Sequence, residues 1–233
     1  MKMWNSFGAW ALVGAVAFGA GNSGAEIHPW ASWAPGTWVE TEIVPFDSGK
    51  MLNRETLMGA GPDGVQIARV TTMSGPGGPV DVDTQMTLGL ATMGSAHLDP
   101  GRKNLGNEKR VALGRRFDCT VWRAAGSLDG KVSQETTWMT AELDYPVRIE
   151  TKFGPWELSL DLVQLEDSIR VGNKKVSGAR YEGTAASADR EDRVFQVRSA
   201  EVPGGLVRTE MRRKLENGSF SVHSNTVVAF ETP

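Results

Sequence analysis

The sequence predicts an all-β protein with few short helices, whose strands form a single large antiparallel curved sheet, a half-barrel or a barrel. After the first 25 residues, about a dozen short stretches alternate apolar and polar residues, which is the period of strands with one solvated face. The same part of the chain shows no convincing helical period. Turn signals rich in glycine and proline separate the alternating stretches, as is typical of antiparallel sheets and barrels.

A repeated unit of strand, turn, strand, proline-marked corner and strand supports this fold class. The unit spans residues 114–150 and returns at residues 172–210. The offset between the copies is 57 to 59 residues, as in the step from Trp122 to Tyr181. A fixed period that carries aromatic, apolar and turn residues together indicates one supersecondary unit used twice. We therefore expect residues 26–233 to form one antiparallel β domain.

The first 25 residues have the composition of a signal peptide. Lys2 is a short basic region, residues 7–20 are an uncharged apolar run, and Ser23 and Ala25 occupy the small-residue positions before a cleavage site. A helix of this apolar run, at about 1.5 Å per residue, is shorter than a hydrocarbon core of about 30 Å. We expect an exported protein, periplasmic or extracellular, with no stable membrane span once the signal is removed. A hydrophobic helix of the fold or an uncleaved anchor is the alternative.

The mature chain begins with a tryptophan-rich segment, which four strands follow. Residues 28–36 contain two prolines, so they hold one helical turn at most, and we expect their indoles to pack across an open end or face of the sheet. Residues 59–64 form a turn, and residues 74–79 are too rigid and too rich in glycine for the interior of an element. The strands expected around them are residues 37–44, 50–58, 65–72 and 80–88.

Residues 89–107 are the least regular portion of the chain. From Gly101 onwards the chain has a local positive bias, and basic residues spread in this way commonly keep the edge of a sheet soluble. An alternative is that they attract an acidic ligand. The basic residues are Arg102, Lys103, Lys109, Arg110, Arg115 and Arg116. Residues 156–162 then give the cleanest strand signal, because apolar and polar side chains alternate there without exception. The strands expected in this half lie within residues 114–122, 137–140, 146–150, 156–162, 172–181, 194–197, 203–213 and 219–230.

Asn217-Gly218 is the strongest hairpin signal in the chain, and it joins the last two expected strands. In the final strand we expect one shared apolar face, which leaves His223 on the more polar face as a surface or second-face residue. The members expected on the apolar face are Phe220, Val222, Val228 and Phe230.

Charge and cysteine content exclude several classes of function. A formal net charge of −3 and a pI near 5.7 give no general attraction to nucleic acid or to anionic membranes. Cys119 is the single cysteine, so no intramolecular disulfide forms. Because Cys119 alternates with Phe117 and Val121, we interpret it as a small buried apolar residue rather than a reactive thiol.

The sequence has no short catalytic or metal-binding motif. Its three histidines, His28, His97 and His223, are far apart, and the zincin, nucleophile-elbow and paired-cysteine patterns are all missing. Asp81 and Asp83 lie two residues apart on an expected strand, which is typical of a solvated face rather than a metal site. We therefore predict no catalytic residues, no metal ligands and no cofactor.

The best candidates for ligand contact are the large aromatic side chains. Tryptophans supply a large apolar surface with one polar atom, although in β proteins they more commonly fill the core. Both interpretations stay open for the six candidates: Trp30, Trp33, Trp38, Trp122, Trp138 and Trp156.

Two motifs carry a resemblance to known proteins. The early segment Trp33-Ala34-Pro35-Gly36-Thr37-Trp38-Val39 and the late segment Glu201 to Arg208, together with the export signal, resemble exported bacterial β-proteins of no assigned function. The repeated strand–proline–strand corner is similar, more distantly, to the periplasmic lipoprotein-carrier (LolA/LolB-like) superfamily. That resemblance implies a curved antiparallel sheet with a helical lid, which binds acyl chains in its concave face.

Three functions follow as hypotheses. The sequence favours a non-catalytic exported protein that binds a lipid, another apolar small ligand or an envelope partner protein in the concave face of its sheet. One alternative is a hydrolase-type enzyme whose residues converge from separate strands around His97 or His223. The other is a structural envelope protein without a small ligand.

Overall fold

The computed structural model describes residues 30, 33–46, 49–61, 64–75, 78–88, 103–128 and 131–233. In this part of the chain thirteen strands form and no helix is present. The strands are β1 (Trp38–Val44), β2 (Met51–Gly61), β3 (Gly64–Gly75), β4 (Gly78–Leu88), β5 (Lys103–Ala112), β6 (Arg115–Leu128), β7 (Lys131–Met139), β8 (Arg148–Phe153), β9 (Trp156–Val171), β10 (Lys174–Ser187), β11 (Arg190–Arg198), β12 (Leu206–Lys214) and β13 (Phe220–Glu231).

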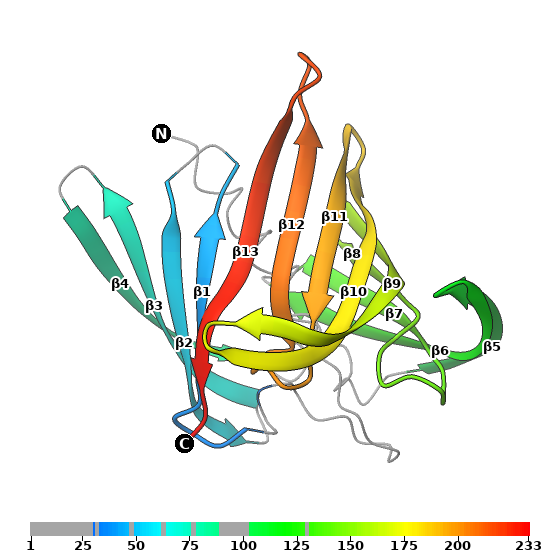
Figure 1. Cartoon of the computed structure of the whole chain (residues 1–233), viewed down its shortest axis with the longest axis horizontal. Coiled ribbons are helices and arrows are strands. Elements are labelled where there is room, and N and C mark those ends of the chain that lie inside the picture. Colours follow the sequence, from blue (N-terminus) through cyan, green and yellow to red (C-terminus); the bar gives the residue numbers. More distant parts are fainter. Residues whose placement is uncertain are drawn as a thin grey trace.

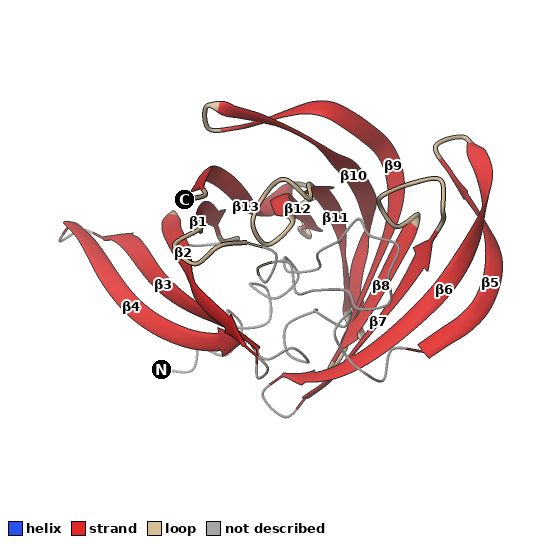
Figure 2. Cartoon of the chain, turned by 90° about the horizontal axis from the view of Figure 1, so that it is seen from below, coloured by secondary structure: helices blue, strands red, loops and turns tan. Residues whose placement is uncertain are grey.

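All thirteen strands belong to one antiparallel sheet. Its order is β4-β3-β2-β1-β13-β12-β11-β10-β9-β8-β7-β6-β5, so every neighbour except the β1–β13 pair is also a neighbour in sequence. The sheet curls into an open trough whose edges are β4 and β5 (Figures 1 and 2). This confirms the predicted all-β fold and selects the curved, open sheet over the closed barrel.

The internal repeat is visible in the strand boundaries. The first strands of the two copies, β6 and β10, both have 14 residues, and the second strands, β7 and β11, both have 9. The step from residue 115 to residue 174 is 59, and so is the step from residue 131 to residue 190. The third strands start at residues 148 and 206, a step of 58, so the slip in the period lies in the proline-marked corner.

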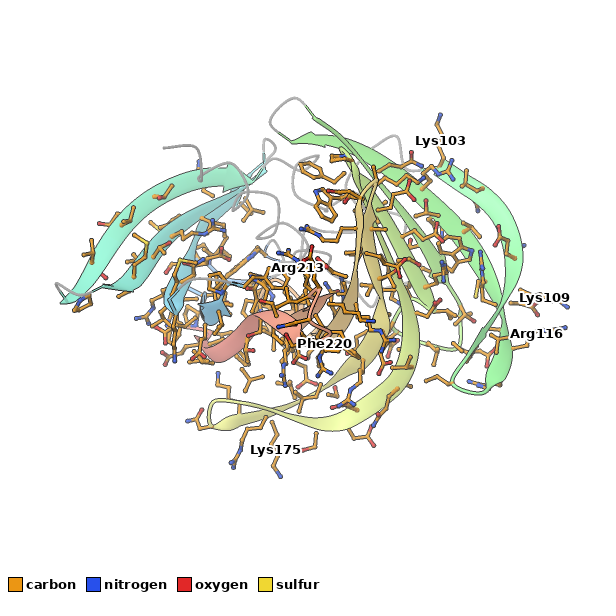
Figure 3. The ribbon with its side chains drawn as sticks, turned by 90° about the horizontal axis from the view of Figure 1, so that it is seen from above. Lys103, Lys109, Arg116, Lys175, Arg213 and Phe220 are labelled. Carbon is orange, nitrogen blue, oxygen red and sulfur yellow. The ribbon has the colours of Figure 1, made fainter. Side chains whose placement is uncertain are left out.

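Two segments, one rich in glycine and one rich in basic residues, contain more strand than we expected. Residues 74–79, expected to be a loop, are mostly the ends of β3 and β4, because the ladder continues to the Gly75–Gly78 pair. β5 begins at Lys103, inside the segment 89–107 that we expected to be irregular, and continues to Ala112. Its side chains are nearly all exposed, so it lacks the apolar alternation that marks a strand. Its Lys103 and Lys109 point away from the trough (Figure 3), as expected for a soluble edge.

Two hydrophobic clusters stabilise the sheet. The first is centred on β6 to β10, and it includes Cys119, which is buried as predicted and whose thiol pKa is raised chiefly by that burial. The second joins β1, β2 and β3 to β13 and to the tip of the β9–β10 hairpin. That tip packs on β13 (Figure 1), since a Cβ added at Gly172 would lie 2.8 Å from the Val228 carbonyl oxygen.

A β-bulge in β13 changes which side chains face the interior. The register with β1 shifts between Glu40 and Thr41, so that Thr41 pairs with Val227 while Glu40 pairs with Ala229. The extra residue, Val228, reverses the alternation. The shared apolar face expected for this strand was therefore wrong: Phe220 and Val222 are exposed, and the buried residues are His223, Asn225, Val227 and Phe230.

The close approach of β9 and β10 gives a test of this packing. A Cβ added at Gly183 would lie 1.7 Å from the Ser159 carbonyl oxygen, whereas one at Gly59 on β2 would meet open space. We expect Gly183→Ala to lower the free energy of unfolding by about 1–3 kcal/mol or more, because β9 and β10 must move apart to make room for the methyl group. Gly59→Ala should stay within about 0.5 kcal/mol of wild type. Urea unfolding followed by circular dichroism measures both, and equal effects of the two substitutions would contradict the packing.

Candidate functional site

A group of polar side chains lies on the inner face of β11, β12 and β13, where the trough is deepest. Inward-facing residues alternate along each strand, so neighbouring strands place them in rows across the sheet. Arg213 lies on this inner side of the curved sheet (Figure 3). Two rows next to it are set by the pairing register: Val194, Met211 and His223 form one, and Gln196, Thr209 and Asn225 form the other.

Asp192 holds the charged end of the group together. Its carboxylate is fully buried, with Arg190 Nε 3.3 Å from Oδ2 and Arg213 Nε 3.6 Å from Oδ1. Each guanidinium also stacks on an aromatic ring: Arg213 lies 3.8 Å from the ring centre of Phe46 and Arg190 lies 4.7 Å from that of Trp156. Stacking and ion pairing together fix both arginines in position.

His223 lies one row from this charged end, and it is buried. Its ring centroid is 5.6 Å from that of Phe46. Burial lowers the pKa of His223; the polar side chain of Asn225 acts against this shift, and the positive charge of Arg213 adds to it. His223 is therefore neutral near pH 7. The interpretation of His223 as an ordinary surface residue was wrong, because the bulge at Val228 places it inside.

Several buried atoms of this group lack a hydrogen-bond partner among the described residues. An unsatisfied buried polar atom costs about 1–3 kcal/mol, so such atoms in a native protein usually meet water, an ion or a ligand. Six such atoms lie together on this face of β11, β12 and β13. The atoms are both carboxylate oxygens of Asp192, which make ionic contacts only, Arg213 Nε, Thr209 Oγ1, His223 Nε2 and Asn225 Oδ1.

A second polar group, around Arg198, has a structural role. Arg198 is fully buried, and its Nε and Nη2 donate to Gln196 Oε1 at 3.0 and 2.7 Å. Burial lowers the pKa of Arg198, while the carboxylate of the buried Glu135 acts against this shift. The Tyr181 hydroxyl donates to the carbonyl oxygen of Pro146 at 3.0 Å, which ties β10 to the corner before β8. Burial raises the pKa of that hydroxyl.

The six candidate tryptophans do not form one group. Trp30 is buried in the second hydrophobic cluster and Trp33 packs against it. Trp138 belongs to the first cluster, and its Nε1 donates to Glu108 Oε2 at 2.9 Å. The side chain of Arg54 covers Trp38, with its guanidinium carbon 3.8 Å from the ring centre.

The remaining two tryptophans are half-buried. Trp122 pairs in register with Thr137 on β7. Trp156, through Arg190, is the candidate that reaches the polar group. Contact of any of the six with a ligand stays a prediction. The sequence does contain a signal for the polar group, because His223, Asn225 and Val227 alternate along the last strand. Without the bulge, however, this alternation places the three side chains on the outer face of the sheet.

His28 and His97 lie outside the described residues. Within the described ranges, no three or more histidine, cysteine, aspartate or glutamate residues are arranged to hold a metal ion. The same part of the chain contains no helix with the length and apolar character to cross a membrane.

Fold and site together define the class: an all-β protein with one open antiparallel sheet and a polar group on its inner face. No protein-family model matches the chain. No curated protein matches it either.

Solved structures share some likeness with the chain. A candidate lipoprotein from Parabacteroides distasonis ATCC 8503 matches with a TM-score of 0.38 and 11% identity, over 85% of this chain and 96% of that one. A candidate exported protein with a YmcC-like fold from Bacteroides fragilis NCTC 9343 gives 0.35 and 10%, over 86% and 97%. The MucA/MucB complex of Pseudomonas aeruginosa gives 0.19 and 12%, over 88% and 91%. Likeness of this degree carries no argument about ligand or partner, and the resemblance to lipoprotein carriers stays a prediction.

The burial of His223 predicts a pH dependence of stability. Its pKa is lower in the folded chain than its unfolded value of about 6.5, so below that pH the unfolded state binds the additional proton. The stabilisation is complete above pH of about 6.5 and is lost as the pH falls towards the folded pKa. Urea unfolding between pH 7.5 and 5 should show this loss in the wild type and a smaller slope in His223→Gln. His97→Gln serves as the control, and identical slopes for wild type and His223→Gln would contradict the assignment.

Proposed function

We propose that this protein is an exported, non-catalytic binding protein that holds a lipid or another amphipathic ligand against the concave face of its sheet. The observation that carries the proposal is the set of unsatisfied buried polar atoms on β11, β12 and β13. These atoms lie between the two hydrophobic clusters. A ligand with one polar end and an apolar chain complements both kinds of surface.

The apolar neighbours of the polar group support an apolar chain on the ligand. Val194 and Met211, both of the first cluster, share a row with His223. Val227, of the second cluster, follows Asn225 on the same face of β13. Ile43 on β1 pairs with Asn225 and is partly exposed, so apolar surface continues from the polar group across the next strand.

A hydrolase has less support from the same residues. The charged group that acts on His223 is Arg213, and the carboxylate of Asp192 meets Arg190 and Arg213 rather than the imidazole. A general base needs a carboxylate or a carbonyl to orient its ring and stabilise its protonated form. A positive neighbour does the opposite, so binding is the better hypothesis for this site.

Co-purification tests the proposal directly. The full chain, expressed in a bacterium with its own leader, should carry about one amphiphile per molecule, detected by native mass spectrometry and solvent extraction. After the ligand is stripped, the protein should enhance the fluorescence of N-phenyl-1-naphthylamine, and lysophospholipid should displace the dye. A ligand-free mass together with no dye binding would reject the proposal and leave the structural envelope role.

Neighbouring residues on β1 provide a matched pair of variants. Ile43 shares a face with Asn225, whereas Val44 pairs with Ser224 on the opposite face, and both side chains are partly exposed. Ile43→Asn should weaken dye binding by about tenfold, because it removes part of the apolar surface offered to the chain. Val44→Asn should leave binding unchanged. A larger effect from Val44→Asn would place the ligand on the outer face.

Export is tested at the N-terminus of the purified protein. The small residues Ser23 and Ala25 predict cleavage after Ala25, so Edman sequencing or mass spectrometry should find a chain that starts at Glu26. Ala25→Phe should leave the precursor uncleaved, since a bulky ring does not fit the small-residue position. A purified wild-type chain that still starts at Met1 would contradict the prediction.

A further inference from the structure

We propose that the polar end of the site binds the acidic head group of the amphiphile, a carboxylate or a phosphate, with Arg213 as its charged partner. This inference rests on the proposed function and specifies the chemical class of its ligand. Three neutral side chains, His223, Asn225 and Thr209, supply the remaining polar contacts.

The charge balance of the group favours an anion. Asp192 is fully buried, and its two carboxylate oxygens face Arg190 and Arg213, so this carboxylate is already engaged by two guanidinium groups. Arg213 forms no ion pair with a second carboxylate of the described residues. A cationic head group beside Arg213 would meet a like charge, whereas an anionic one would pair with it.

The geometry of Arg213 leaves its donors available. Nε faces Asp192 at 3.6 Å, and the flat face of the guanidinium stacks on Phe46 at 3.8 Å. The side chain is 22% exposed, and it makes no hydrogen bond to another described residue. Within the described chain Nη1 and Nη2 have no hydrogen-bond partner, and such a pair of N–H donors forms a fork that matches two oxygens of a carboxylate or phosphate.

The neutral side chains around Arg213 are suited to the same ligand. His223, Thr209 and Asn225 are each more than nine-tenths buried and each has an atom without a hydrogen-bond partner in the described chain. A hydroxyl, an amide and a neutral imidazole all offer N–H or O–H donors without adding charge. An oxyanion held by Arg213 would accept from the Thr209 hydroxyl and from an N–H at His223 Nε2, which a purely apolar ligand would leave unpaired. The unpaired atom of Asn225 is Oδ1, an acceptor, so Asn225 would meet an oxyanion through its amide N–H instead.

Amphiphiles with one shared chain and different head groups test the inference. The stripped protein is titrated with laurate, dodecyl phosphate, dodecanol and dodecyltrimethylammonium in the dye-displacement assay, and with acetate and inorganic phosphate alone. We expect both anionic amphiphiles to bind at least tenfold more tightly than dodecanol, and the cation to bind most weakly. Displacement by inorganic phosphate as effective as that by dodecyl phosphate would assign the site to a free anion and overturn the inference.

Two arginines on the same strand separate head-group recognition from the fold. Arg213→Gln should weaken laurate and dodecyl phosphate by about tenfold to a hundredfold, the effect of losing a charge-assisted pair, and leave dodecanol unchanged. Arg212→Gln is the matched control, since Arg212 is about half exposed and pairs with Glu210 instead. It should bind every amphiphile as the wild type does.

The outcomes distinguish the two proposals. If all amphiphiles bind equally to wild type and to Arg213→Gln, the head-group inference fails while the proposed function stands. If none binds, the proposed function itself fails. Thermal unfolding checks that each variant is folded, and Arg213→Met replaces Arg213→Gln if that one unfolds, because its apolar chain still packs on Phe46. Arg213→Met should show the same loss of preference for anions.

Discussion

The pairing of β1 with β13 is the contact on which the rest of the structure depends. It joins four N-terminal strands to nine C-terminal strands, and every other pair in the sheet links strands that follow one another in sequence. The bulge at Val228 lies within this pair and shifts the alternation of β13 by one residue. As a result one strand turns both Phe230 and His223 inward, although an even and an odd position would otherwise face opposite sides. β13 therefore contributes side chains both to a hydrophobic cluster and to the polar group.

The polar group therefore lies at a seam between two hydrophobic clusters, each of which belongs mainly to one part of the sheet. Burying a carboxylate with two guanidinium groups is costly, and well-packed apolar residues of similar volume commonly serve stability as well or better. Arg198, which is also fully buried, makes two hydrogen bonds to Gln196. The group around Asp192 differs, because several of its atoms have no hydrogen-bond partner in the described chain. That difference is the reason for proposing a ligand at this group.

Strand periodicity and turn chemistry are sufficient to predict the antiparallel sheet, its internal repeat and the buried position of Cys119. These two signals fail where a strand shows no alternation of apolar and polar residues, or where no glycine or proline marks an irregularity. β5 is an exposed edge strand, so nothing forces its side chains to alternate. The bulge at Val228 inserts one residue without any glycine or proline to mark it, and this displaced the expected position of His223. The tryptophans were reasonable candidates by composition, yet size also suits them to cores, and Trp30 and Trp138 lie in different clusters. Which residues form a site depends on cross-strand neighbours, and register is not encoded in single-strand patterns.

The number of strands explains why the trough is open. Neighbours in this sheet all run antiparallel, so the first and last of thirteen strands, β4 and β5, run in the same direction. Closing the trough would require a parallel ladder between them, which has a different hydrogen-bond geometry from the rest of the sheet. Both edges instead carry exposed charges, Asp81 and Asp83 on β4 and Lys103 and Lys109 on β5, which discourage pairing with other chains. The exposed charges thus protect the two edges that the sheet leaves unpaired.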